Sequence, residues 1–211
     1  MGNVSARHAT SAFGVAAFAL TMASIPLYFT HDGPPPVSNV LARSLLDMLA
    51  CAALIGFLVG LRQLLRDARP DAEWLANLCL AWGLAYMTAA FVSISIQVGA
   101  VLGTDGRLDP TTLGGRGESA ILIFGPLARL LTALCLLAAA AASRGSGLLP
   151  RWTERAAQGV ALFHLAMVPT LFSGTLPAHF YSINGWNIPV AGGLFVAWVL
   201  AVSLALLRQK A

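Results

Sequence analysis

Apolar residues gather in six long runs along the chain, separated by short segments that hold most of the charged residues. An α-helix needs about 20 mainly apolar residues to cross the hydrocarbon core of a bilayer, and each run approaches or exceeds that length. Lipid offers no partner to backbone amides and carbonyls, and the runs lack the strict alternation of barrel strands. The pattern therefore predicts an all-α, polytopic membrane bundle, a single domain over residues 1–211, with six transmembrane helices at about residues 12–29, 40–61, 74–102, 119–142, 156–176 and 188–207.

Composition supports a membrane protein and argues against a water-soluble one. Of the 211 residues, 57% are hydrophobic and 10% are charged, whereas soluble domains carry about 25% charged residues. The segments between the runs are too short to form a separate catalytic domain. A catalytic site, if the chain has one, is therefore expected within the helices or beside them.

Arginine placement predicts the orientation, because cytoplasmic connections of membrane proteins are rich in Lys and Arg. Basic residues lie before the first run and after the second, fourth and sixth: Arg7, Arg62, Arg66, Arg69, Arg144, Arg151, Arg155, Arg208 and Lys210. The alternate connections are poor in basic residues, or balance Arg107 and Arg116 with Asp105, Asp109 and Glu118. Both termini are therefore expected on the cytoplasmic side (N-in/C-in).

The first run could also be a secretory signal peptide, because Arg7 precedes it. The run is long for that purpose and no clean A-x-A cleavage motif follows it, which favours an uncleaved anchor. Ala, Leu and Arg are abundant and Lys210 is the only lysine, a usage typical of a GC-rich bacterial source. The expected location is a bacterial plasma membrane.

Five polar residues fall inside the predicted spans and are candidate ligand-binding residues, because such groups are costly in lipid. They are Arg43, Asp47, Gln97, Arg129 and His164, with Asp47 and His164 as the candidate catalytic residues. Counting 1.5 Å per residue places them in the outer half and centre of the bilayer. One interpretation is a single polar pocket with net positive charge that accepts an anionic head group or a carboxylate. The other is a structural Asp47–Arg129 ion pair that joins the second and fourth spans, with Arg43 reaching outward.

Three functions remain open on this basis. The first is a bundle that binds an amphipathic or lipid-like molecule in its outer half. The second is an intramembrane, cyclase-like enzyme acting on an isoprenoid or lipid, with Asp47 as the acid. The third is a small proton-coupled transporter in which Asp47 or His164 carries the proton.

Other sites and partners are less favoured by the residues present. Cys51, Cys79 and Cys135 lie singly in apolar runs, which indicates packing and predicts no metal site. No second histidine lies at the depth of His164, which disfavours haem, and no lysine lies in a span to bind retinal, so no cofactor is expected. The scattered positive charges do not suggest nucleic-acid binding.

Membrane lipids are the expected partners. Gly56 and Gly60 form a G-x-x-x-G step that favours close packing within the bundle and leaves a homo-oligomer open.

The sequence Leu148-Leu149-Pro150-Arg151-Trp152, followed by a glycine-containing span, resembles the L-x-P-R-W link between late helices in a broad group of small bacterial multi-pass membrane proteins of unassigned function. The likeness covers about a third of the chain. It implies a multi-pass helical bundle and assigns no catalytic residue.

Overall fold

The computed structural model describes residues 2–31, 33–103, 107–110, 114–174 and 179–209. Its described part is all-α, with a single isolated bridge between Pro36 and Arg107. Asp105, Lys210 and the last two residues of the predicted fifth span lie outside the described residues. The helical segments are α1 (Gly2–Ser24), η1 (Ile25–Tyr28), α2 (Val37–Ala68), η2 (Pro70–Ala72), α3 (Glu73–Leu102), α4 (Gly114–Leu122), η4 (Ile123–Leu127), α5 (Ala128–Ser143), α6 (Arg151–Met167), η5 (Val168–Phe172) and α7 (Asn187–Arg208).

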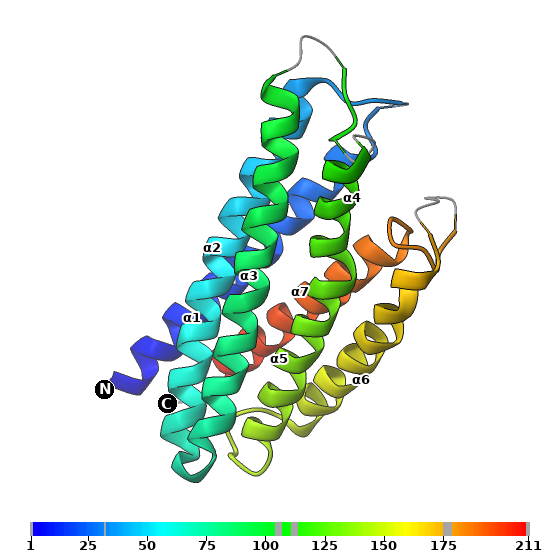
Figure 1. Ribbon diagram of the computed structural model, residues 1–211. Helices are drawn as coiled ribbons and strands as arrows, with labels where there is room; N and C mark the ends of the chain where they lie inside the picture. The colour runs from blue at the N-terminus through cyan, green and yellow to red at the C-terminus, as the bar shows by residue number, and fades with distance from the viewer. Residues whose placement is uncertain (1, 32, 104–106, 111–113, 175–178, 210–211) are drawn as a thin grey trace.

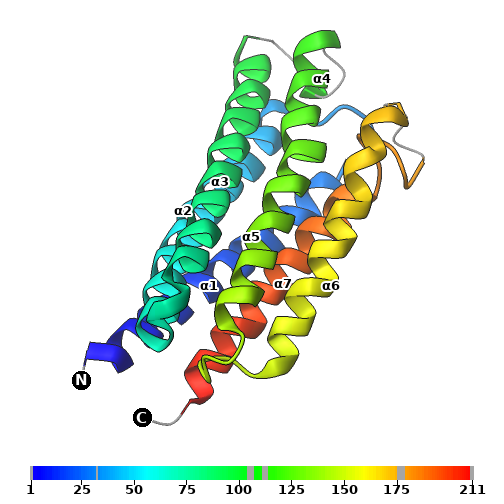
Figure 2. The same ribbon diagram turned by 60° about the horizontal axis from the view of Figure 1, so that its bottom comes forward.

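The long helices form a closed ring in which each packs against two neighbours. Going round the ring, α1 contacts α2, α2 contacts α3, α3 contacts α5, α5 contacts α6, α6 contacts α7, and α7 returns to α1. Successive rods run in opposite directions, as Figures 1 and 2 show from two sides. Both chain termini, the α2–α3 turn and the α5–α6 link lie at one end of the bundle, here called the termini end. The other three connections lie at the opposite end, here called the loop end.

Prolines set most of the helix boundaries, because proline lacks the amide hydrogen that a continuing helix needs. Pro26 follows the end of α1 and Pro70 follows the end of α2. Pro36, in extended conformation, precedes α2, and Pro150 does the same for α6. Each predicted span overlaps a helical rod, but the bounds differ. α1 begins ten residues before the first predicted span, and α2 and α6 also extend beyond the predicted runs into the flanking polar segments.

Two of the rods are interrupted part way along. The rod of α4 and α5 passes through a π-helical turn, η4, where Gly125 leaves helical geometry (φ −89°, ψ −105°) just before Pro126. The rod of α6 stops at Met167 and continues as the short 3₁₀ helix η5, which contains Pro169. The two interruptions pack against each other, so two neighbouring rods are broken at the same level.

The interior of the ring is filled by aliphatic and aromatic side chains. Phe57 of α2 and Trp198 of α7 meet edge to face, with ring centroids 6.3 Å apart. Phe195 joins this cluster by stacking on Trp198 and by an edge contact, at 5.8 Å, with Tyr86 of α3. The indole nitrogen of Trp198 donates a hydrogen bond to the carbonyl of Thr153, 3.1 Å away, so its polar atom is satisfied inside the core.

Glycines on α2 let α1 approach closely. A Cβ at Gly56 would come within 2.7 Å of the Phe13 ring, and one at Gly60 would overlap the Thr10 hydroxyl. This confirms the expectation that the G-x-x-x-G step packs within the bundle. Self-association of the chain remains a prediction, which would have to use another surface.

Five of the rods are long and apolar enough to cross a membrane: Val4–Tyr28, Val37–Ala68, Pro70–Leu102, Gly117–Ser143 and Asn187–Arg208. The chain is accordingly compatible with a multi-pass membrane protein. The rod of α6 and η5 is not among these five. α6 itself has 17 residues, and three of its first five are charged. At 1.5 Å per residue α6 covers about 25 Å, against a hydrocarbon core of about 30 Å.

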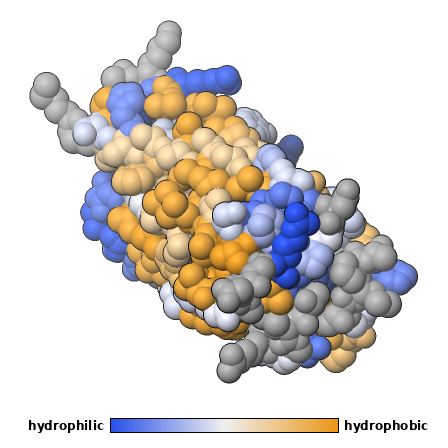
Figure 3. All heavy atoms as spheres, turned by 90° about the horizontal axis from the view of Figure 1, so that it is seen from above, coloured by the Kyte–Doolittle hydropathy of each residue, from blue (hydrophilic) through white to orange (hydrophobic). Residues whose placement is uncertain are grey.

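Side chains at the two ends and on the flanks agree with a membrane setting. Trp74 and Trp152, at the termini end, are 62% and 54% exposed, and Trp186, near the loop end, is 55% exposed. Amphipathic aromatic rings of this kind favour the membrane–water boundary. Viewed from the loop end, hydrophobic side chains cover much of the molecule between hydrophilic patches (Figure 3).

Candidate functional site

Four of the five predicted site residues lie in two separate groups of polar side chains rather than in one. The first, the Asp47 group, lies where α1, η1 and α2 meet near the loop end and consists of Ser24, Tyr28, Asn39, Arg43 and Asp47. The second, the Arg129 group, joins α5, α6, η5 and α7 and consists of Arg129, His164, Thr170 and Asn187. Their contacts give each group a different chemistry.

The Asp47 group is built on one stripe of α2. Asn39, Arg43 and Asp47 are spaced four residues apart, so they share a helix face. The Asp47 carboxylate accepts a hydrogen bond from the Ser24 hydroxyl at 2.5 Å and another, on its second oxygen, from the Tyr28 hydroxyl at 2.9 Å. Both of its oxygens are therefore engaged by α1 and η1.

Arg43 is the residue of this group whose polar atoms are least satisfied. Its side chain is buried, with 6% of the residue exposed, and its guanidinium carbon lies 4.3 Å from the centre of the Tyr28 ring in a cation–π contact. Its Nε donor has no hydrogen-bond partner in the described structure. One helical turn away, Asn39 donates to the Leu27 carbonyl at 3.0 Å, but its own amide oxygen is buried without a partner among the described residues.

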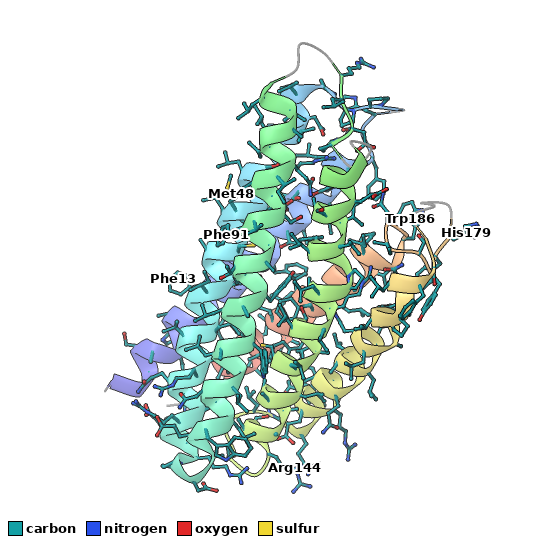
Figure 4. The ribbon with its side chains drawn as sticks, in the orientation of Figure 1. Phe13, Met48, Phe91, Arg144, His179 and Trp186 are labelled. Carbon is teal, nitrogen blue, oxygen red and sulfur yellow. The ribbon has the colours of Figure 1, made fainter. Side chains whose placement is uncertain are left out.

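The Asp47 group borders the outside of the bundle rather than its core. Tyr28 is 45% exposed and Asp47 is partly exposed, although Arg43 beneath the tyrosine ring is buried. Phe29, next to Tyr28, stacks on Trp186 at 5.0 Å and so ties this corner to the α6–α7 connection. His179 and Trp186 mark that connection in Figure 4, where Arg144 marks the opposite end.

Arg129 is fully buried, at 2% exposed, and is held entirely by neutral groups. One terminal nitrogen donates to the Met167 carbonyl at 3.2 Å and to the Thr170 hydroxyl at 2.7 Å, and the other donates to the side-chain oxygen of Asn187. The Met167 carbonyl, exposed where α6 breaks, thus accepts from the guanidinium and also from the Thr170 hydroxyl, 2.7 Å away. The guanidinium fixes that break to the start of α7. Asn187 in turn donates to the Phe180 and Ser182 carbonyls and so orders the segment before α7.

His164 lies on the last turn of α6 and is 4% exposed. Its Nε2 is 3.1 Å from the Ala191 carbonyl of α7. Because a carbonyl can only accept, Nε2 carries the hydrogen, and Nδ1 is left as a buried acceptor with no partner among the described residues. His164 therefore joins α6 to α7.

The expected Asp47–Arg129 ion pair is wrong. The ion pairs within the described residues are Arg62–Glu73, Arg66–Asp67 and Arg69–Asp71, all at the termini end. Asp47 is held by hydroxyls of α1 and η1, and Arg129 by groups of η5 and α7, because their side chains leave α2 and α5 toward different neighbours. Arg43 and Asp47 also form no ion pair within the described part of the chain, since Arg43 lies over the Tyr28 ring.

The single polar pocket expected from the sequence is divided in the same way. Arg43 and Asp47 belong to one group and Arg129 and His164 to the other. Gln97, on α3, is joined to neither by any hydrogen bond found in the described residues. A cavity of about 510 Å³ lies near it, between the end of α3 and α4, and is lined by Ser95, Ile96, Gly99, Ala100, Gly115 and Ser119. None of the five predicted residues lines this cavity.

Five residues of the two groups are absent from the site predicted from the sequence: Ser24, Tyr28, Asn39, Thr170 and Asn187. Asn39 carries a usable signal, which is its four-residue spacing to Arg43 and Asp47. Ser24 and Asn187 carry none, because they lie at helix ends, where polar residues are common. Thr170, a single hydroxyl residue in the middle of η5, carries none either. Tyr28 is an aromatic residue of the kind common at the membrane–water boundary. Its hydroxyl also donates a hydrogen bond to the Asp47 carboxylate.

The cysteines give no metal centre. Cys51, Cys79 and Cys135 are buried and free, and the Cys79 and Cys135 sulfurs lie 3.7 Å apart between α3 and α5. Within the described residues, no three His, Cys, Asp or Glu side chains are grouped so as to hold a metal ion.

No protein-family model, curated protein or solved structure matches the chain.

Proposed function

We propose that the chain crosses a bacterial plasma membrane six times, with both termini in the cytoplasm. Support comes from the common position of the termini at the end that carries Arg69, Arg144 and Arg155. The five residues of η5 add about 10 Å to the 25 Å of α6, at about 2 Å per residue of 3₁₀ helix. The combined rod is long enough to cross.

We infer that this bundle binds an amphipathic molecule with an anionic head group at the Asp47 group, in the outer half of the membrane. The observation that carries the inference is Arg43, a buried guanidinium whose Nε donor has no partner among the described residues. Leaving a buried polar donor unsatisfied costs about 1–3 kcal/mol, and more for a charged group. A phosphate or carboxylate oxygen is the acceptor that a guanidinium binds best.

The surroundings of Arg43 favour an external ligand over an internal partner. Asp47, the nearby carboxylate, already accepts from Ser24 and Tyr28. The free amide oxygen of Asn39 offers an acceptor to a hydroxyl or amine on the same head group. The exposed ring of Tyr28 supports a site at the rim of the bundle, where an amphiphile can enter from the lipid with its tail left in the bilayer.

Arg129 and His164 lie outside the proposed ligand-binding site. The donors of Arg129 are occupied by Met167, Thr170 and Asn187, so the residue holds the bundle together and does not contact the ligand. Across the two groups, the two guanidinium ions outnumber the one carboxylate, and this excess positive charge favours an anion near the loop end.

The proposal predicts that dodecyl phosphate stabilises the purified protein through Arg43. In a maltoside detergent, a saturating amount of this amphiphile should raise the unfolding temperature of the wild-type protein by roughly 5–10 °C, if its concentration reaches about 100 times Kd. Arg43→Gln should remove most of that rise, because the amide lacks the charge and the forked donors. The measurement is a thermal unfolding curve with and without dodecyl phosphate.

Arg144→Gln is the matched control, since Arg144 is exposed at the termini end. It should keep the full rise. A rise unchanged in Arg43→Gln, or lost equally in Arg144→Gln, would contradict the proposed site. Mass spectrometry of molecules that copurify with the wild-type protein then identifies the natural amphiphile.

The enzyme hypothesis, with Asp47 as a general acid, has weaker support. Both carboxylate oxygens accept hydroxyl hydrogens, an arrangement that suits an ionised carboxylate better than a proton donor.

A transporter is the second candidate, because the neighbouring breaks at η4 and η5 resemble the interrupted helices on which transporter sites are built. Uptake into proteoliposomes that ignores a pH gradient would argue against proton coupling.

A further inference from the structure

A groove separates the beginning of α6 from the end of α7 at the termini end. It has a volume of about 460 Å³ and is lined by Pro150, Trp152, Ala197, Leu200, Ala201, Leu204, Ala205, Arg208 and Gln209. Its wall is mainly apolar, with one cation and one exposed indole at the end nearest the polar boundary. Ligand pockets commonly have volumes of about 300–1,000 Å³.

At the termini end, some arginines form ion pairs with acidic neighbours, whereas others form none among the described residues. At the α2–α3 turn, Arg62, Arg66 and Arg69 form ion pairs with Glu73, Asp67 and Asp71 respectively. Arg151 and Arg155 in the first two turns of α6, and Arg208 at the end of α7, take part in none of the ion pairs formed by the described residues. Glu154 is the one acidic residue of α6. Positive charge that the described acidic residues do not neutralise therefore lies around the groove.

Trp152 and the α5–α6 link fix the polar edge of the groove. Trp152 is 54% exposed, and an indole at this position favours the level of lipid head groups. Gln209 donates to the Leu148 carbonyl, so its amide holds the link against the end of α7. Arg208 is the one cation that lines the groove within the described structure, and it is exposed to an incoming ligand.

We propose that this groove binds an anionic phospholipid from the leaflet at the termini end. The phosphate lies against Arg208, with Arg151 adding to the local positive potential, and an acyl chain lies along Leu200, Ala201 and Leu204. Basic pockets between transmembrane helices attract anionic head groups in this way. The site is separate from the Asp47 group, which lies at the loop end, and the proposal does not depend on the function proposed for that group.

The test compares phosphatidylglycerol with phosphatidylcholine of identical acyl chains, bound to the full-length protein in detergent and counted by native mass spectrometry. The wild-type protein should retain phosphatidylglycerol preferentially. The double variant Arg151→Gln/Arg208→Gln should lower that preference roughly 25-fold, since each basic residue near an anionic lipid contributes a factor of about five. Arg66→Gln, which removes a paired arginine from the same end, should leave the preference unchanged.

A second variant tests the apolar wall without changing charge. Ala201→Phe should fill the groove and reduce the retention of both lipids. The proposal is overturned if the double variant keeps the wild-type preference, if Arg66→Gln lowers it equally, or if Ala201→Phe retains both lipids as the wild-type protein does.

Discussion

Replacement of Arg129 by methionine is expected to destabilise the protein more than any other single substitution of a polar residue discussed above. The change removes the donors to the Met167 carbonyl, the Thr170 hydroxyl and the Asn187 side chain at once. A hydrogen bond to a charged group contributes about 1.5–3 kcal/mol. The Met167 carbonyl still accepts from the Thr170 hydroxyl, 2.7 Å away, whereas the side-chain oxygen of Asn187 is left without a donor among the described residues. The expected result is a large fall in the unfolding temperature in detergent and in the amount of protein recovered from membranes.

Arg129→Lys is the informative companion variant. Lysine keeps the charge but presents it as a point, whereas the guanidinium fork reaches groups on η5 and α7 together. We expect Arg129→Lys to recover only a small part of the lost stability, and Arg155→Met, at an exposed position, to behave as wild type. Wild-type stability in Arg129→Met would show that the break in α6 is not held by this side chain.

Gly60→Leu is expected to displace α1 from α2. A Cβ at Gly60 would overlap the Thr10 hydroxyl oxygen and come within 3.0 Å of the Thr10 Cβ, so a leucine cannot fit without movement of the whole helix. Overpacking in protein interiors typically costs about 1–3 kcal/mol, and more where the backbone must shift. Thermal unfolding in detergent measures the loss.

Gly159→Leu provides the control for this substitution. Gly159 lies on α6, where an added Cβ would have no atom from another part of the described chain within 4 Å, and leucine raises helix propensity equally at both sites. Gly159→Leu should therefore leave the unfolding temperature unchanged or raise it slightly. An equal loss in the two variants would point to a general intolerance of larger side chains, rather than to the α1–α2 contact.

The helices can be predicted from the sequence because membrane spans are specified by length and hydrophobicity, and their ends by proline and charge. Pro26, Pro36, Pro70 and Pro150 lie at four of the observed boundaries. The spans predicted from hydrophobicity miss these positions, because they run through Pro26 to Phe29, begin at Val40 and Ala156, and end at Leu61. The break after Met167 is harder to define, because Pro169 indicates a kink but not whether the helix resumes.

The grouping of the polar residues cannot be predicted in the same way. Counting residues gives the depth of Asp47 and Arg129 but not the direction in which each side chain leaves its helix. That direction depends on which helices are neighbours in the ring. The short connections are compatible with more than one such order, so the sequence does not specify it. Ser24 and Asn187 become partners of these residues only through the packing of α1 on α2 and of α5 against the start of α7.

The claim that the chain is a six-span membrane bundle is tested most directly by reporter fusions that reveal the compartment of each connection. Fusions after Arg69, Asp109, Ser146, Asn184 and Gln209 should report cytoplasm, outside, cytoplasm, outside and cytoplasm in that order. A fusion after Asn184 that reports the same compartment as one after Gln209 would contradict the sixth crossing, and agreement between Arg69 and Asp109 would contradict the bundle as a whole.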